Sequence, residues 1–234
     1  MKKYNCATAG KPLLPEDIRP LSVLIRTLDY LVTHIMDSKD HALSYIERFV
    51  SDRLRSIRAD LRVQSISDIH AVTHIYETSV RWHSMMRYEL ADTPVDTFNP
   101  VQNNENLSQA FSSLRQMYSD NNRLMHCHEA EMSSYYLLYN LRNSFLLIFH
   151  EQPLAQQKLP DVQFALHVYR SISERNYLSF FRLLRSATYL QACLMHEHVP
   201  RMRTLALKVC SFSRWYSFVF FFVFIIYVYI FSVD

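Results

Sequence analysis

The sequence predicts an all-α protein, an α-solenoid built from antiparallel helix pairs that stack against one another. Apolar residues recur at helical spacing along most of the chain, which favours amphipathic helices. The 234 residues include one glycine, Gly10, and neither an Asn-Gly nor an Asp-Gly pair, so the tight turns of a hairpin-rich sheet protein are not expected. Short polar stretches separate the helical segments, and helices joined in this way pack as antiparallel neighbours.

The first helix is expected to begin at Pro20, because proline suits the first position of a helix. Its apolar face is formed by Leu21, Leu24, Ile25, Leu28, Leu31, Val32 and Ile35. A polar leader, residues 1–18, precedes a helical domain predicted over residues 19–209, and residues 210–234 form a hydrophobic tail.

Two further helices follow a polar loop at residues 37–40. The second has an apolar stripe formed by Ile46, Val50, Leu54, Ile57 and Leu61. Ser67 and Asp68 look like the cap of the third helix, which is expected to run to about Leu90. The face of the third helix is formed by Ile69, Val72, Tyr76 and Val80. Residues 91–105 carry two prolines and three asparagines without a sustained period, so they are interpreted as a surface loop.

The helical pattern resumes at Leu107 and continues through the rest of the domain. Further helices are predicted from Leu107 to Tyr118, over 132–149, from Val162 to Ile172, over 177–195 and over 200–209, with a polar break at 150–160. No strict internal repeat occurs, so the repeating units of the solenoid would be degenerate.

Composition excludes several classes of protein. With a single glycine, the chain cannot carry a phosphate-binding loop, a dinucleotide fingerprint or a Gly-x-Ser-x-Gly nucleophile elbow. The four cysteines lack paired spacing and no apolar secretory signal opens the chain, so a reducing cytosol or nucleus is expected. The formal net charge of +3 is too small to indicate nucleic-acid binding by itself.

Arginines are concentrated in the second helix, over residues 48–62. At 100° per residue, four of them are expected to lie along one border of the apolar stripe: Arg48, Arg55, Arg58 and Arg62. Three interpretations remain open, namely packing over the core seam with acids of neighbouring helices, contact with a nucleic acid, and contact with a protein partner. The structural interpretation is favoured because long charged side chains ordinarily flank a core stripe, and because no interleaved aromatic residues form a stacking platform here.

Three groups of residues carry side chains that bind metals in other proteins. They are His126, Cys127, His128 and Glu129; His196, Glu197 and His198 with Cys193; and His70, His74 and Glu77. Adjacent ligands on a helix cannot all turn to one ion, no Cys-x-x-Cys frame accompanies them, and Ala71 stands where a metalloprotease helix needs glutamate. We therefore predict no catalytic, metal-binding or cofactor-binding residues and no enzyme activity.

A series of segments in order resembles the SAC/GANP family domain over about residues 4–209. The segments are YNCATAGKPLLPEDIRP, LIRTLDYLVTHIMD, YIERFVSDRLRSIRADLRVQSI, IYETSVRWHSMM, LRQMYSD, EAEMSSYYLLYNL and NYLSFFRLLRSATYLQACLMHEHVPRMRTLAL. The resemblance implies a non-catalytic scaffold with a superhelix of the PCI or TPR type that ends in a winged helix. It also implies a PCI-type partner subunit, a small acidic partner protein and possible contact with RNA, but no small-molecule substrate.

The resemblance implies a role in mRNA export from the nucleus, within the nuclear-pore-associated transcription-export complex. A shorter branch of the family is linked to centrosome duplication and progression of the mitotic spindle, which gives an alternative role. The expected location is the nucleus, including the nuclear envelope and pore, and the cytoplasm, with the centrosome as the alternative.

The family pattern gives way near the end of the chain to an apolar run in place of the expected winged helix. Residues 215–233 contain no charge and are long enough to cross a bilayer core of about 30 Å. The predicted membrane segment includes Trp215, Phe221, Ile225 and Val233, and Lys208 and Arg214 before it would keep the helical domain on the cytosolic or nucleoplasmic side. A membrane-tethered adaptor is therefore another alternative. The competing interpretations are a truncated or misread C-terminus and a buried helix.

Overall fold

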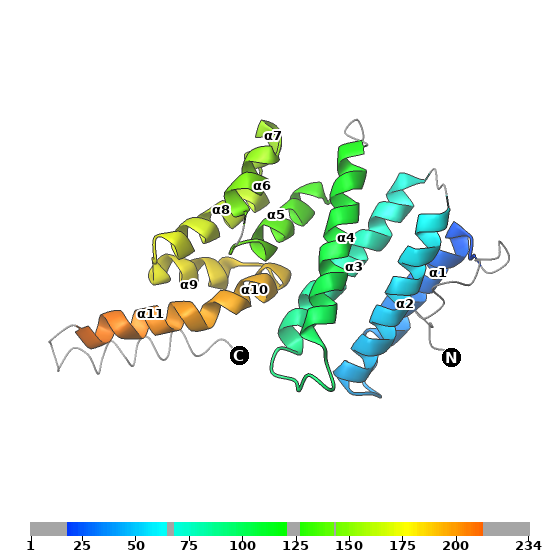
Figure 1. Ribbon diagram of the computed structural model, residues 1–234, viewed down its shortest axis with the longest axis horizontal. Coiled ribbons are helices and arrows are strands. Elements are labelled where there is room, and N and C mark those ends of the chain that lie inside the picture. The colour runs from blue at the N-terminus through cyan, green and yellow to red at the C-terminus, as the bar shows by residue number, and fades with distance from the viewer. Residues whose placement is uncertain (1–17, 65–67, 121–126, 143, 213–234) are drawn as a thin grey trace. The chain divides into compact units, whose positions relative to one another are not determined.

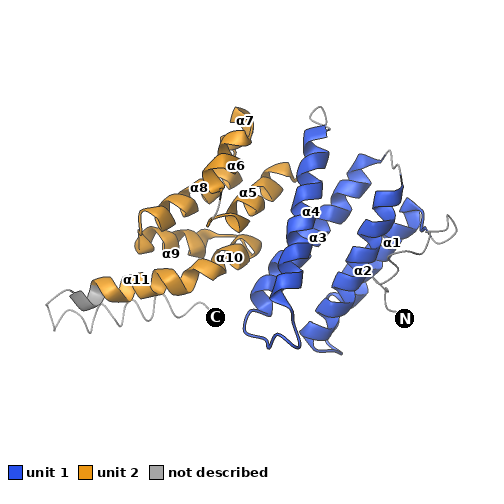
Figure 2. Cartoon of the chain, viewed as in Figure 1, with its two compact units in different colours: residues 1–126 blue, residues 127–234 orange. Residues whose placement is uncertain are grey.

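The structure, a computed structural model, describes residues 18–64, 68–120, 127–142 and 144–212. Helices are the regular secondary structure of these residues and no strand occurs among them, so the all-α prediction is confirmed. The chain divides into two compact units, Met1–His126 and Cys127–Asp234 (Figure 2).

Unit 1 contains long helices that lie side by side in chain order (Figure 1). Its elements are α1 Leu21–Tyr30, the π-helical turn η2 Leu31–Ile35, α2 Leu43–Val63, α3 Ile69–Glu89 and α4 Pro100–Asp120. Helices α3 and α4 are antiparallel, because His83 contacts Asn103 whereas Glu77, which is earlier in α3, contacts the later residue Tyr118.

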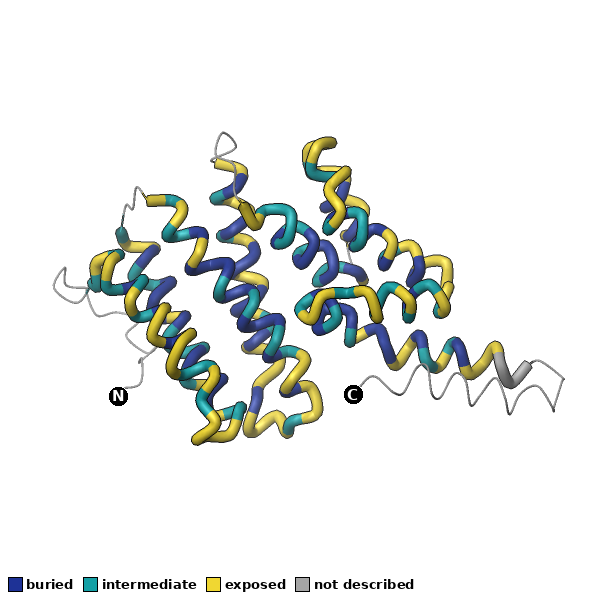
Figure 3. Tube along the Cα trace, turned by 180° about the vertical axis from the view of Figure 1, so that it is seen from behind, coloured by how far each residue is buried: buried dark blue, intermediate teal, exposed yellow. Residues whose placement is uncertain are grey.

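The core of unit 1 follows the predicted apolar stripes closely in α2. Val50, Leu54 and Ile57 have no solvent exposure, as the periodicity predicts. Helix α3 packs against both α2 and α4, and it is therefore buried on more of its circumference than a single stripe would allow (Figure 3). Its predicted face is only partly buried, because Ile69 and Val72 keep intermediate exposure.

The starts of α1 and α3 test two predicted helix starts. Asp68 caps α3 as predicted, since its Oδ1 accepts a hydrogen bond of 3.1 Å from the Ala71 amide. Helix α1 begins at Leu21, one residue later than predicted. Pro20 has extended backbone angles of φ −65° and ψ 156°, so it takes the capping position and not the first helical position.

The predicted loop over 91–105 is wrong in its second half. Helix α4 begins at Pro100, and its N-terminus is capped by Asn99, whose Oδ1 accepts hydrogen bonds from Val101 at 3.0 Å and Gln102 at 3.1 Å. An asparagine followed by proline is a favourable helix start, and it outweighs the polar composition of the first turn. Apolar periodicity could not detect this first turn because its residues are largely polar.

Unit 2 is built from shorter helices. Its elements are α5 Glu129–Tyr139, α6 Phe145–Glu151, α7 Leu154–Gln157, α8 Pro160–Ser173, α9 Tyr177–Ser186, α10 Tyr189–Met195, the 3₁₀ turn η3 His196–His198 and α11 Val199–Phe212. Helix α5 packs against α8 and α10, and α9 packs against α8, α10 and α11. These contacts surround an apolar core that includes Leu137, Val162 and Phe180, each without solvent exposure.

Two predicted helices of unit 2 are each divided in the structure. The helix predicted over 132–149 is interrupted between Asn140 and Ser144, where Ser144 has a left-handed backbone with φ 58°. The helix predicted over 177–195 is divided at Ala187, and Thr188 forms a capping box with Gln191 that starts α10. A short helix, α7, also occupies part of the predicted polar break at 150–160.

Residues 213–234, nearly all of the hydrophobic tail, are outside the part of the chain that the structure describes. Trp215, Phe221, Ile225 and Val233 all belong to this range, so the predicted membrane segment remains a prediction. Within the described ranges, none of the helices combines the length and apolar character needed to cross a membrane.

Candidate functional site

Helix α2 presents an exposed row of arginines, which we call the arginine face. Arg48, Arg55 and Arg62 are all exposed, and their seven-residue spacing places them on nearly the same side of the helix. The buried residues Val50, Leu54 and Ile57 hold the opposite side against the core. The sequence therefore groups these three guanidiniums correctly, but they lie across α2 from the apolar stripe and not along its border, as predicted.

Arg58, the fourth predicted contact residue, is not on the arginine face. Its side chain is buried, with 2% exposure, and it points to α4. Its Nη1 donates to the backbone oxygen of Asn106 at 3.2 Å, and its Nη2 donates to Asn106 Oδ1 at 3.1 Å. Burial lowers the pKa of Arg58 to about 10, helped by the positive charges of Arg62 and Arg55, so the side chain still carries its charge at neutral pH.

A buried histidine lies near Arg58. His83 Nδ1 is 2.8 Å from Asn103 Oδ1, while Asn103 Nδ2 donates to the backbone oxygen of His83 at 3.0 Å. This pairing assigns the proton of the neutral ring to Nδ1. Burial, with the positive charge of Arg58, lowers the pKa of His83 to about 3, so the ring is neutral at physiological pH.

A groove with a volume of about 680 Å³ adjoins the arginine face. It lies between α2 and the segment that leads into α4. Its cations include Arg48, Arg53 and Arg55, its aromatic side chains are Tyr45 and Phe49, and its amides include Asn99 and Gln102. This combination offers charge for phosphates or carboxylates, planar surfaces for stacking and amide donors and acceptors.

Acidic side chains offset part of the positive charge of the groove. Asp52 pairs with Arg53 at 2.7 Å, and Arg53 also lies 5.6 Å from the centre of the Phe49 ring. Glu47 accepts a hydrogen bond of 2.6 Å from Ser51 Oγ, and burial raises the pKa of this carboxyl. Arg48 and Arg55, which also belong to the arginine face, are the exposed cations of the groove.

Sequence reasoning missed the aromatic and amide side chains of the groove. Tyr45 lies just before the arginine-rich stretch and Phe49 lies within it, but the sequence alone gives no reason to place them beside the segment that leads into α4. Asn99 and Gln102 belong to the segment that the sequence predicts as a loop. The Asn99–Pro100 pair is the sequence signal that would have placed these two amides at the start of a helix.

Within the described ranges, no three His, Cys, Asp or Glu residues come close enough to hold a metal ion. His126, which belongs to the first group with metal-binding residue types, lies outside these ranges. His70 and His74 are exposed, whereas Glu77 is buried at 4% exposure. The carboxylate of Glu77 accepts a hydrogen bond of 2.9 Å from Tyr118 and lies 3.7 Å from Arg81. In the group of Cys193, His196, Glu197 and His198, Glu197 pairs with Arg142 at 2.9 Å.

Comparison with known proteins connects this arrangement to one family. The model of the SAC3/GANP family matches residues 1–217. SAC3 family protein B of Arabidopsis thaliana is 31% identical over 223 residues, which cover 88% of this chain and 13% of that protein. Protein xmas of Drosophila melanogaster is 31% identical over 219 residues, covering 88% of this chain and 10% of the relative.

A relative from a third organism is similar to this chain to about the same degree. SAC3 family protein 1 of Schizosaccharomyces pombe is 32% identical over 232 residues, which cover 89% of this chain and 22% of that protein. The chain thus spans less than a quarter of the length of these three curated relatives.

Proposed function

This chain belongs to the SAC3/GANP family, and we propose that it acts as a non-catalytic scaffold subunit in mRNA export from the nucleus. The observation that carries the proposal is the family match over residues 1–217, which extends through both compact units. As the resemblance of the sequence implies, the partners we propose are a PCI-type subunit and a small acidic protein. The proposed location is the nucleus, at the nuclear pore and envelope, and the cytoplasm.

The surface chemistry of unit 1 supports a docking role. Its buried polar residues, such as Arg58 and His83, are engaged in hydrogen bonds that join helices. Its exposed arginines instead face solvent from a helix held rigid by the core. We propose that the arginine face meets the phosphates of RNA, because exposed cations give attraction that does not depend on base sequence.

Depletion of the protein from cells tests the export role. We expect poly(A) RNA to accumulate in the nucleus, as measured by in situ hybridisation, and expression of the full chain should reverse the accumulation. Affinity purification of the tagged full chain should also recover a PCI-type subunit. Normal distribution of poly(A) RNA after complete depletion would contradict the proposal, and abnormal centriole numbers in those same cells would assign the chain to centrosome duplication.

A further inference from the structure

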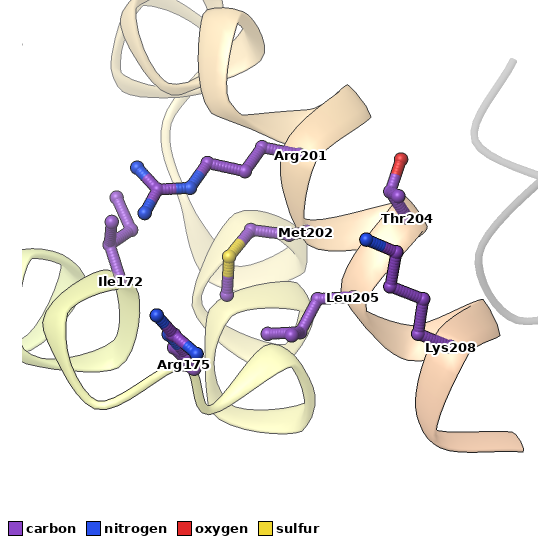
Figure 4. A pocket seen from close by; sticks show the side chains of 7 residues that line it. All are labelled: Ile172, Arg175, Arg201, Met202, Thr204, Leu205 and Lys208. Atoms are coloured by element: carbon purple, nitrogen blue, oxygen red, sulfur yellow. The ribbon is translucent and has the colours of Figure 1, made fainter. Parts of the chain in front are cut away.

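A second pocket lies in unit 2, where the end of α8 meets α11, and it has a volume of about 400 Å³ (Figure 4). Its lining combines an apolar floor of Ile172, Met202 and Leu205 with the cations Arg175, Arg201 and Lys208. The size is within the range of about 300–1,000 Å³ that is typical of small-ligand pockets. The pocket is therefore large enough for one side chain of a bound molecule and the atoms next to it.

The charge around this pocket is strongly one-sided. None of its lining residues is acidic. Residues 170–208 contain seven arginines and lysines but only two glutamates. Arg175 and Arg201 are exposed, and neither guanidinium forms a hydrogen bond or an ion pair with another residue in the described part of the chain. Both cations are available to a ligand that carries negative charge.

The backbone at Arg175 gives a separate reason to expect a role for this side chain. Arg175 has a φ of 56° and occupies the left-handed position that ends α8. The Arg175 amide donates to Ile172 O at 3.2 Å and the Asn176 amide donates to Ser171 O at 2.8 Å, which is the Schellman pattern. Glycine is the usual residue there, and a residue with a Cβ costs roughly 1–2 kcal/mol in that conformation.

We propose that this pocket is a docking site for an acidic peptide segment that carries one aliphatic side chain. The aliphatic side chain contacts the apolar floor, while Asp or Glu residues beside it pair with Arg175 and Arg201. Opposite charge draws the segment to the rim, and burial of the aliphatic group against Leu205 and Met202 supplies affinity that does not depend on salt. This inference rests on unit 2 alone and does not depend on the export role.

The lining favours a peptide over a nucleic acid. Bases bind by stacking on aromatic rings, and none of the pocket's lining residues is aromatic. The apolar floor consists of Ile172, Met202 and Leu205, which match an aliphatic side chain better than a planar base. Single-stranded RNA is therefore the competing ligand in the test, not the proposed one.

Fluorescence anisotropy with the full chain tests the proposal. The probe is a labelled short peptide of Asp and Glu residues around one central Leu, and the comparison peptide has Ser in place of Leu. We expect the Leu peptide to bind about tenfold more tightly than the Ser peptide. Arg201→Gln and Arg175→Gly should each weaken binding of the Leu peptide by about two- to fivefold.

Two controls separate docking from folding and from general attraction. Arg182→Gln removes an exposed charge outside the pocket lining, and it should leave binding unchanged. Arg175→Gly removes a cation but relieves the left-handed strain, so its melting temperature should not fall. The proposal is overturned if the Leu peptide does not bind, if Arg182→Gln weakens binding as much as Arg201→Gln, or if oligouridine displaces the probe better than the unlabelled peptide does.

Discussion

The side chain of Arg58 carries a charge and is nevertheless almost fully buried, because Asn106 accepts two of its hydrogen bonds. Arg58→Ala would leave both oxygens without these donors, so we expect a loss of about 2–4 kcal/mol in the free energy of unfolding. Arg55→Ala removes an exposed arginine of the same helix and should change the free energy of unfolding by no more than about 0.5 kcal/mol. Urea unfolding followed by circular dichroism measures both, and equal losses would refute a structural role for Arg58.

His83 makes the free energy of unfolding depend on pH. Its pKa is about 3 in the folded protein and about 6.5 in the unfolded chain. As the pH falls, the unfolded chain therefore binds the proton first, and stability is lost between about pH 6.5 and about pH 3. We expect a loss of about 2 kcal/mol between about pH 7 and about pH 5.

His83→Gln isolates this contribution, whatever its effect on stability at neutral pH. The variant should show a smaller decrease in unfolding free energy over the same pH interval. Glu47 acts in the opposite sense, because its raised pKa means that the folded state binds a proton more readily than the unfolded state does. Parallel pH profiles for the wild-type protein and His83→Gln would show that His83 has the same pKa in the folded and unfolded states, which would contradict this prediction.

At the residue scale, the sequence correctly groups Arg48, Arg55 and Arg62 on one side of α2 but wrongly adds Arg58, which is buried. Arg48, Arg55 and Arg62 repeat every seven residues, so local periodicity alone places them together. Whether Arg58 meets solvent depends on Asn106, which is 48 positions away in the sequence and belongs to α4. The sequence of α2 alone does not identify this partner, because Asn106 becomes a neighbour of Arg58 only in the folded protein.

At the scale of elements, the start of α4 depends on one side chain. Asn99→Ala removes the oxygen that accepts from the amides of Val101 and Gln102, which should destabilise the protein by about 1 kcal/mol. Hydrogen exchange of the first turn of α4 should become faster. Asn99→Ser keeps a capping oxygen and should retain most of the protection. If Asn99→Ala leaves the exchange of this turn unchanged, the cap does not stabilise α4.

The arginine face also belongs to this scale, because the α2 helix fixes the spacing of its charges. Replacement of Arg48, Arg55 and Arg62 by Gln should weaken binding of single-stranded RNA and make it less dependent on salt, by a slope of about 0.7 for each phosphate that the protein no longer neutralises. The helical content should stay the same, since all three side chains are exposed.

A matched triple variant serves as the control for this experiment. Arg26, Lys39 and Arg115 are exposed in unit 1 but outside α2, and their replacement by Gln removes the same charge. Filter binding at several salt concentrations compares the two variants. Equal weakening would indicate that net charge attracts RNA and that the arginine face has no special role.

The limits of sequence reasoning at this scale are visible between α5 and α6. Apolar residues keep their helical spacing from Met132 to Phe149, so the pattern predicts one helix. The chain breaks near Ser144, which takes a left-handed backbone without glycine or proline to mark it. Likewise, Asn99 before Pro100 starts a helix whose first turn is largely polar. Periodicity identifies helical faces but not the turns that divide or extend them.

At the scale of the whole molecule, the sequence predicts one helical domain over residues 19–209, and the structure groups its contacts into two compact units. Two units are compatible with one domain. Stacked helices contact mainly their neighbours in the chain, so such a fold tends to build its stability from local segments. Apolar patterns describe each helix in turn and contain no information about where these segments separate.

The two units lead to a prediction about how stability is distributed. Leu54 in α2 and Leu137 in α5 both have no solvent exposure, so Leu54→Ala and Leu137→Ala should each cost about 2–5 kcal/mol. Because each residue packs within its own unit, Leu54→Ala should speed hydrogen exchange mainly in α1 to α4, and Leu137→Ala mainly in α5 to α11. Mass spectrometry of exchanged peptides distinguishes the two patterns. If both variants instead speed exchange equally throughout the chain, the units open together as a single cooperative structure, and the local stability expected of stacked helices does not hold for this protein.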